Sequence, residues 1–301
     1  MTGDHETRIQ LALEVLAGLS VGDALGEALS YQCYRVRELL DFSVYQDGSV
    51  RYTDDTEMAI AVLEVLKSTC SIGEDLLAWK FSSRFRRDPE RGYGRMARRI
   101  LNEIGAGVDW RTASRGAFGG GGSFGNGAAM RVAPLGAYFS DAIGLIPGEA
   151  ERSAVVTHSH PEGIAGAVAV AIAAGIAVGA RGELPEDAGE RIWEGVLRFT
   201  PESTVRERLA AARSMSDAEP AEVAKRVGNG AEVSAQDTVP FCVWNACRSL
   251  GDYEEALVST IEVDGDCDTN AAIVGGIVTG YLGEAGFPAD WLRVRERLPE
   301  L

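Results

Sequence analysis

Apolar side chains recur every three or four residues through most of this chain, which is the spacing of one buried helix face. The clearest stripes are Ile9, Leu13, Leu16 and Leu19; Met58, Val62 and Leu66; and Ile192, Trp193, Val196 and Leu197. Strict alternation, which marks a strand, is nearly absent. One short hairpin is predicted over residues 42–52, around Asp47 and Gly48, and a single hairpin cannot make a sheet. We therefore expect an all-α fold, with residues 1–301 forming a single domain.

The excess of acidic over basic residues limits the classes of partner that the protein is expected to bind. The chain carries 29 Lys and Arg residues against 45 Asp and Glu residues, a formal net charge of −16. Non-specific binding to nucleic acid or to an anionic membrane needs surplus positive charge, so we expect neither. Local binding of an anion stays open, because backbone N–H groups or a metal ion can supply the positive field.

Three further features bear on location. Segment 163–180 is uncharged and about long enough to span a bilayer, but it is mostly Ala and Gly, so we expect a buried core helix instead. Five cysteines with no CxxC pair predict reduced thiols. The first ten residues are polar and of mixed charge, unlike a secretory signal. We expect a cytoplasmic protein, and a monomer.

Thr53, Asp54 and Asp55 form the first acidic cluster, at the start of a helix predicted over 55–67. One interpretation is an N-cap, in which Thr53 or Asp54 bonds the free N–H groups of the first turn. A cap needs only one such residue, however, and Thr56 and Glu57 add further side-chain oxygens directly afterwards.

Asp264, Asp266 and Asp268 form the second cluster, ahead of an apolar helix predicted over 271–282. Carboxylates at every second position repel one another unless a cation neutralises them. An EF-hand is excluded, because its sixth position would be Thr269 instead of Gly and its twelfth Gly275 instead of Glu. An N-cap by Asp268 would explain only one of the three carboxylates.

Both clusters offer hard oxygen ligands and contain neither His nor closely spaced Cys pairs. This favours Mg²⁺, Mn²⁺ or Ca²⁺ over Zn²⁺. If the fold brings the clusters together, their five carboxylates exceed what one divalent ion needs, and two ions about 3.5–4 Å apart become natural.

A glycine-rich stretch, residues 116–127, carries no strand before it and no Lys-Ser or Lys-Thr after it, so neither a Rossmann site nor a P-loop is predicted. Its N–H groups can still approach a phosphate closely, and the loop is predicted to enter a helix near Ala128. A flexible surface loop is the alternative. Two of the three histidines, His158 and His160, follow ahead of the predicted core helix, where a structural role is the alternative to a functional one.

Five short motifs follow one another along the chain: Gly22-Asp23-Ala24-Leu25-Gly26, Thr53-Asp54-Asp55-Thr56, Ser123-Phe124-Gly125-Asn126-Gly127-Ala128-Ala129-Met130-Arg131, Thr157-His158 and Gly265-Asp266-Cys267-Asp268-Thr269-Asn270. In this order they resemble the ADP-ribosylglycohydrolases, relatives of dinitrogenase reductase-activating glycohydrolase. The match spans about residues 11–282. The resemblance implies a compact orthogonal multi-helix bundle, a binuclear Mg²⁺ centre (Mn²⁺ being an alternative), and hydrolysis of the glycosidic bond between ADP-ribose and a modified acceptor. The implied partner is an ADP-ribosylated protein or a small ADP-ribose conjugate.

The resemblance also implies roles for individual residues. The metal ligands fall on Thr53, Asp54, Asp55, Asp266, Asp268 and Thr269. Among these, Asp55 or Asp54 is expected to be the catalytic carboxylate, and their roles are interchangeable at this point. The residues expected to bind substrate are Gly122, Ser123, Phe124, Gly125, Asn126, Gly127, Met130 and His158.

One position departs from the family pattern. Many relatives carry a glutamate seven residues after the aspartate of the first motif, and here that position is Ser30. The resemblance associates this glutamate with hydrolysis of serine-linked ADP-ribose, and some arginine-directed members lack it, so Ser30 favours ADP-ribosyl-arginine. Hydrolysis of serine-linked ADP-ribose or of O-acetyl-ADP-ribose remains an alternative. So does an ADP-ribose-binding or structural protein that has lost catalysis.

Overall fold

The computed structural model of the chain describes residues 4–39 and 46–301. Within these residues the regular elements are helices, and the all-α prediction is confirmed. Strand-like pairing in this part of the chain is limited to two isolated bridges, Val50 with Arg295 and Gly125 with Ser234. Of the hairpin predicted over 42–52, residues 42–45 lie outside the described residues, and Val50 pairs with Arg295 rather than across a hairpin.

The α-helices are α1 (His5–Leu29), α2 (Val36–Leu39), α3 (Asp54–Thr69), α4 (Glu74–Arg87), α5 (Arg95–Gly105), α6 (Trp110–Arg115), α7 (Ala133–Tyr138), α8 (Ile146–Val155), α9 (Pro161–Gly179), α10 (Pro185–Phe199), α11 (Thr204–Arg213), α12 (Pro220–Val227), α13 (Ala235–Arg248), α14 (Tyr253–Glu262), α15 (Cys267–Leu282) and α16 (Ala289–Val294). Short 3₁₀ turns are η1 (Ser30–Arg35), η3 (Ala117–Gly120), η4 (Asn126–Ala128), η5 (Ile143–Leu145) and η6 (Glu284–Gly286).

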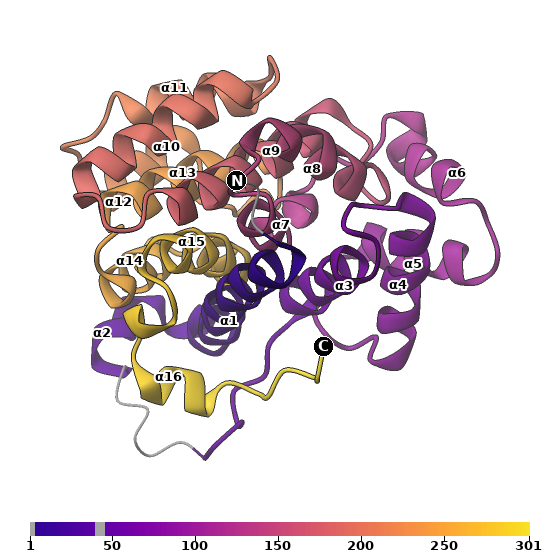
Figure 1. Cartoon of the computed structure of the whole chain (residues 1–301), viewed down its shortest axis with the longest axis horizontal. Helices are drawn as coiled ribbons and strands as arrows, with labels where there is room; N and C mark the ends of the chain where they lie inside the picture. The colour runs from indigo at the N-terminus through magenta and orange to yellow at the C-terminus, as the bar shows by residue number, and fades with distance from the viewer. Residues whose placement is uncertain (1–3, 40–45) are drawn as a thin grey trace.

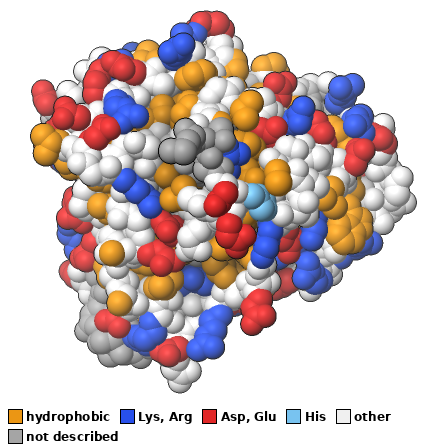
Figure 2. Space-filling model, viewed as in Figure 1, with side chains coloured by type: hydrophobic (Ala, Val, Ile, Leu, Met, Phe, Trp, Pro, Cys, Tyr) orange, Lys and Arg blue, Asp and Glu red, His pale blue; other side chains and the backbone are white. Residues whose placement is uncertain are grey.

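Helices from opposite ends of the chain form the middle of the molecule. The first helix, α1, runs beside α15, with α3 and α7 close to them (Figure 1). In the same view α10, α11 and α13 lie to one side, while α4, α5 and α6 lie to the other. Surface charges of both signs are interspersed over the face shown in Figure 2.

A seam of glycines holds α1 against α15. Gly18, Gly22 and Gly26 recur every four residues and therefore share one face of α1. A Cβ atom on Gly22 would overlap the Ala271 carbonyl, and one on Gly26 would overlap the Cys267 carbonyl. The two backbones therefore approach more closely than any larger side chain would allow. This contact places Asp23, which lies between two of these glycines, beside the start of α15.

Two helical stretches, His5–Glu38 and Pro161–Gly179, are long and apolar enough to cross a membrane by length and composition. Their most apolar windows are 72% and 83% buried inside the protein, respectively. The Ala- and Gly-rich segment expected to be a core helix is α9, and it packs against α7, α8, α10 and α13. The small side chains of α9 thus serve close helix packing inside the protein.

Polar side chains cap several helix starts. Asp252 caps α14 by accepting a hydrogen bond of 3.0 Å from the Glu255 N–H. The start of α15 lies earlier than the sequence predicts, at Cys267 with Asp266 as N-cap residue, so Asp268 stands inside the first turn. The expected α-helix near Ala128 is wrong: residues Asn126–Ala128 form a 3₁₀ turn, and the next α-helix begins at Ala133.

Candidate active site

The first acidic cluster occupies the start of α3. Thr53 is the N-cap residue, and its hydroxyl accepts a hydrogen bond of 3.4 Å from the Asp55 N–H. The same hydroxyl lies 3.0 Å from Asp55 Oδ2. The cap interpretation of Thr53 is therefore correct, and it leaves the carboxylates of Asp54 and Asp55 without a capping role.

Asp23 on α1 is the residue to which this helix start is anchored. Its carboxylate accepts hydrogen bonds from the N–H groups of Thr53 and Thr56 at 3.0 Å each, and from their hydroxyls at 2.8 and 2.5 Å. The side chain is fully buried. Sequence reasoning did not single out Asp23 as a site residue. The sequence does contain a signal that could have revealed it, namely a carboxylate inside an otherwise apolar helix. A buried charge needs partners, so such a residue is a candidate for a structural or functional role.

Three carboxylates from three helices converge. One oxygen each from Asp23, Asp55 and Asp268 lies within 4.8 Å of the other two. The two acidic clusters of the sequence therefore meet in space, as the metal-site hypothesis requires. Asp266 lies next to them, with its Oδ2 accepting a hydrogen bond of 2.6 Å from the Asn126 amide. Asp264, by contrast, faces Cys33 and does not line this site.

Burial and mutual repulsion raise the pKa values of these acids. Burial first, and then the charge of Asp268, raises the pKa of Asp23 to about 7. The same two causes raise the pKa of Asp266 to about 7. The pKa values of Asp54 and Asp55 also lie well above their ordinary range, mainly because both carboxyls are buried among other acids. Ionising all of these buried carboxyls together is unfavourable, and a bound cation would offset their repulsion.

The donor set fits a divalent cation that prefers oxygen. Asp55 Oδ1 is buried and has no hydrogen-bond partner among the described residues, which leaves one acceptor oxygen unsatisfied there. All three converging groups are carboxylates, the ligands typical of Mg²⁺, Mn²⁺ and Ca²⁺. Asp23, Asp55 and Asp268 are thus the side chains suited to hold such an ion, with Asp54 and Asp266 adjacent to it.

A cavity of about 440 Å³ opens beside the carboxylates. Of the residues that the sequence predicts for the site, twelve line it: Asp54, Asp55, Ser123, Phe124, Gly125, Asn126, Gly127, Met130, His158, Asp266, Asp268 and Thr269. Thr53 and Gly122 do not line it. Thr53 lies behind the carboxylates as the cap of α3, and Gly122 packs against Ser159 and His160 with φ of +74°.

The glycine loop is held in place from both sides. His160 N–H donates to the Ser123 carbonyl at 3.4 Å, and Ala235 N–H donates to the Phe124 carbonyl at 2.9 Å. The Ser123 hydroxyl accepts from Gly125 N–H at 3.2 Å. These contacts argue against a flexible surface loop.

At the cavity, the rings of Phe118 and Phe124 stack with centroids 6.0 Å apart, and both rings remain accessible.

His158 is linked through Thr157 to a buried arginine. Arg131, fully buried, donates to the Thr157 hydroxyl at 3.0 Å, and this hydroxyl lies 2.8 Å from His158 Nδ1. Arg131 can only donate, so the Thr157 O–H can in turn donate to Nδ1, an arrangement that places the ring proton on Nε2. Nε2 lies on the side of Gly125 and Gly127. Burial, followed by the charge of Arg131, lowers the pKa of His158 to about 3, so the ring is a neutral donor.

Comparison with known proteins decides the family. Residues 4–301 match the family model described as ADP-ribosylglycohydrolase. The chain belongs to the ADP-ribosylglycohydrolase family. The expected family and the expected class of enzyme, an ADP-ribosyl-acceptor glycohydrolase, are thereby confirmed.

Several similar proteins cover nearly the whole of this ADP-ribosylglycohydrolase. An uncharacterized protein of Archaeoglobus fulgidus is 33% identical, with 95% of this chain and 92% of that protein aligned. "ADP-ribosylhydrolase ARH3" of Xenopus tropicalis is 27% identical over 92% of this chain and 88% of its own length. The human protein of the same name is 28% identical over 92% and 86%, respectively. A solved "ADP-ribosylglycohydrolase-related protein complex" shares the fold, with a TM-score of 0.65, 22% identity, and coverage of 96% of this chain and 93% of that one.

Sequence reasoning missed one wall of this glycohydrolase's cavity. The segment from Gly92 to Ile100, which carries Arg95 at the start of α5, contributes several lining residues. Arg95 is the one Lys or Arg side chain among the described residues that line the cavity. Its sequence neighbourhood is an ordinary polar, basic stretch, so no local pattern marks it.

Proposed function

We propose that this enzyme is a Mg²⁺-dependent hydrolase that cleaves the glycosidic bond between ADP-ribose and a modified acceptor, with ADP-ribosyl-arginine on protein as its preferred substrate. The observation that carries the proposal is the meeting of buried carboxylates, a glycine loop and two accessible aromatic rings around one cavity. Each of these features matches a different chemical part of an ADP-ribose conjugate.

The cavity offers separate surfaces for the parts of ADP-ribose. Its volume of about 440 Å³ lies in the range of small-molecule sites. The Phe118 and Phe124 rings offer faces on which an adenine base can stack. Glycine-loop N–H groups, together with Arg95, suit the diphosphate despite the acidic surface of the protein. His158 Nε2–H is a neutral donor for a sugar hydroxyl or a phosphate oxygen.

The carboxylates suit the bond-breaking step. Cleavage at the anomeric carbon passes through an oxocarbenium-like state, so water must be delivered and deprotonated as the acceptor leaves. Mg²⁺ held by Asp23, Asp55 and Asp268 would polarise ribose hydroxyls and lower the pKa of bound water. Asp55, one oxygen of which finds no partner among residues 4–39 and 46–301, is our choice for the carboxylate that takes the proton, and Asp54 is its neighbour in the cavity.

The preference for arginine rests on Ser30. Serine has no carboxyl group, so this position contributes no acid to the site, and its hydroxyl donates to the Glu27 carbonyl at 2.9 Å. Glu27 lies one helical turn after Asp23, and burial together with the nearby charge of Asp268 raises its pKa. We do not assign to Glu27 the role of the glutamate that other family members carry.

A hydrolysis panel tests the proposal. Peptides carrying ADP-ribose on arginine or on serine, and O-acetyl-ADP-ribose, are each incubated with the enzyme in Mg²⁺, in Mn²⁺ and in EDTA, and released ADP-ribose is quantified. We expect the arginine conjugate to be cleaved fastest and EDTA to abolish release. Release that is insensitive to EDTA contradicts the metal requirement, while preferential cleavage of another conjugate contradicts the linkage.

The same experiment has to be separated from binding of ADP-ribose without turnover. Calorimetry with ADP-ribose separates the two. Tight binding combined with no release from any conjugate supports binding alone, whereas turnover of any conjugate excludes it.

A further inference from the structure

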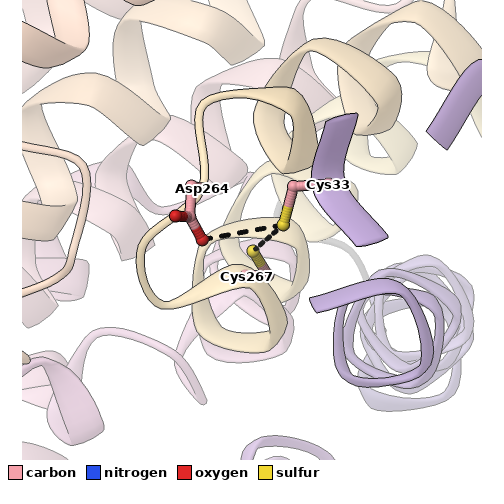
Figure 3. Close-up of side chains that lie close together, drawn as sticks. All are labelled: Cys33, Asp264 and Cys267. Carbon is pink, nitrogen blue, oxygen red and sulfur yellow. Dashed lines mark hydrogen bonds between the residues drawn. The ribbon is translucent and has the colours of Figure 1, made fainter. Parts of the chain in front are cut away.

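Outside the carboxylate site, the fold assembles a second cluster of metal-ligating side chains. Cys33 comes from η1, while Asp264 and Cys267 come from the turn before α15 and its first residue (Figure 3). The three side chains point toward one another, and one ligand atom of each lies within 4.8 Å of the other two. Cys33 and Cys267 are 234 positions apart, so no spacing rule for cysteines could have paired them.

The distances in this cluster match the edges of a tetrahedral metal site. The two sulfur atoms are 3.6 Å apart, and Cys33 Sγ lies 3.6 Å from Asp264 Oδ1. Two sulfurs on a tetrahedral zinc ion lie about 3.8 Å apart, because each Zn–S bond is about 2.3 Å long. A disulfide would need the sulfurs at about 2.05 Å. The thiols are therefore already spaced as two ligands of one ion.

The surroundings of the cluster fit an ion held at the edge of the core. Both cysteines are buried, whereas Asp264 is exposed, so the cluster has one side toward solvent from which an ion and a water ligand can arrive. In the metal-free protein the Cys33 thiol donates to the Ser30 carbonyl at 2.8 Å, and the Cys267 thiol lies 4.0 Å from the Ile261 carbonyl. Metal binding replaces these S–H contacts with metal–sulfur bonds. Two thiolates and one carboxylate suit a borderline-soft cation such as Zn²⁺ much better than Mg²⁺.

We propose that Cys33, Asp264 and Cys267 form a second metal site, which binds a zinc-class divalent cation and is distinct from the carboxylate site. Binding breaks the two S–H bonds, releases both protons to solvent and forms two metal–sulfur bonds. The proposal does not depend on the substrate of the enzyme. Because Cys267 stands between Asp266 and Asp268, a cation here ties η1 to the turn that carries those two acids.

Cobalt provides a readout that is separate from activity. Reduced, metal-free protein is titrated with Co²⁺ and monitored for the near-ultraviolet absorption of a cobalt–thiolate bond, which a site built only from oxygen ligands cannot produce. We expect one thiolate-bound Co²⁺ per chain, displaced by one equivalent of Zn²⁺. We also expect Zn²⁺ to raise the melting temperature, since binding favours the folded state.

Matched variants locate the ion. Cys33→Ser and Cys267→Ser should each weaken Zn²⁺ binding by at least about 100-fold, more than the loss of an outer hydrogen-bond partner costs. Asp264→Asn changes an exposed side chain, so it leaves the core intact, and it should weaken binding while the thiolate absorption persists. Cys70→Ser removes an exposed thiol beside His5 and should change neither the Zn²⁺ affinity nor the cobalt–thiolate absorption.

Three results would overturn the proposal. The first is a folded, reduced protein that gives no thiolate absorption with Co²⁺. The second is absorption that survives in both Cys33→Ser and Cys267→Ser. The third is a protein whose mass without reductant is lower by two hydrogens than its reduced mass, and which binds no metal when reductant is present. These two results together would identify the cysteines as a disulfide pair instead of metal ligands.

Discussion

At the scale of single residues, the carboxylates divide into those that shape the site and those that face the cavity. The Asp23 carboxylate accepts hydrogen bonds from Thr53 and Thr56 and also lies close to the carboxylates of Asp55 and Asp268. Asp55 keeps one buried oxygen without a partner in the part of the chain that the structure describes. Asp23 is thus a positioning residue for the start of α3 as well as a suited cation ligand, whereas Asp55 is left available for chemistry.

Replacing either acid on the cavity side tests this division. We expect Asp55→Asn and Asp266→Asn each to abolish measurable ADP-ribose release, a loss of at least about 100-fold, because the first removes a carboxylate suited to hold the cation and the second removes one adjacent to it. The fold should persist, since the amides have nearly the same volume. Hydrolysis rates and circular dichroism are measured together. A variant that keeps a rate near wild type and an unchanged Mg²⁺ dependence disproves the assignment of that residue.

His158 predicts a particular pH dependence of stability. Its pKa is about 3 in the folded protein and about 6.5 when unfolded, so between these values only the unfolded chain binds the proton. Acid therefore favours unfolding, and the contribution of neutral His158 is lost progressively as the pH falls from about 6.5 toward 3. At pH 5 the loss is about 2 kcal/mol relative to pH 7.5, on the order of 1.4 kcal/mol per pH unit below 6.5.

Denaturant unfolding of the wild type and of His158→Asn, at both pH values, isolates this contribution. The wild type should lose about 2 kcal/mol more than the variant between pH 7.5 and 5. Equal losses in the two proteins would show that His158 binds a proton as readily in the folded state as in the unfolded chain.

At the scale of elements, the glycine seam between α1 and α15 sets the distance between carboxylates on different helices. Asp23 sits between Gly22 and Gly26 in sequence and faces Asp268 across this seam. Helix packing thus decides the geometry of the candidate cation site, because Gly26 packs directly against the backbone of Cys267 and Asp268.

Gly22→Ala tests this dependence. Its Cβ would overlap the Ala271 carbonyl, so the helices must separate, and we expect a loss of about 1–3 kcal/mol in the free energy of unfolding, together with weaker Mn²⁺ binding. Gly148→Ala in α8 is the matched control, because beyond its own helix turn no atom of the described residues lies within 4 Å of the new Cβ. The control should be neutral or more stable by about 0.5–1 kcal/mol. Wild-type Mn²⁺ affinity in Gly22→Ala would contradict a role for the seam.

At the scale of the whole molecule, an acidic protein buries several carboxyls in one place. The net charge is −16, and burial raises the pKa values of Asp23 and Asp266 to about 7. Folding without a cation therefore leaves these acids either repelling one another or protonated. Cation binding relieves that penalty in the folded state only, so it couples to the stability of the entire chain.

Mg²⁺ should accordingly stabilise the protein against unfolding. At a concentration of one hundred times the dissociation constant, the expected gain is about 2.7 kcal/mol, and EDTA should reverse it. Thermal unfolding is followed with and without Mg²⁺ at matched ionic strength, with Asp55→Asn as the comparison. An equal rise in the variant would assign the effect to general screening of the acidic surface.

The sequence by itself determined the helical class, because the apolar period is a local property that each segment displays on its own. It also marked Asp54, Asp55, Asp266 and Asp268 as a metal-site candidate and singled out the loop around Asn126, since repelling charges and consecutive glycines are visible without a fold. Only the tertiary structure decided that Asp23 anchors α3, that Arg95 and Phe118 line the cavity, and that Cys33 meets Cys267. These contacts depend on how helices that are far apart in the chain pack against one another. A local pattern of residues does not indicate which distant segment it will contact.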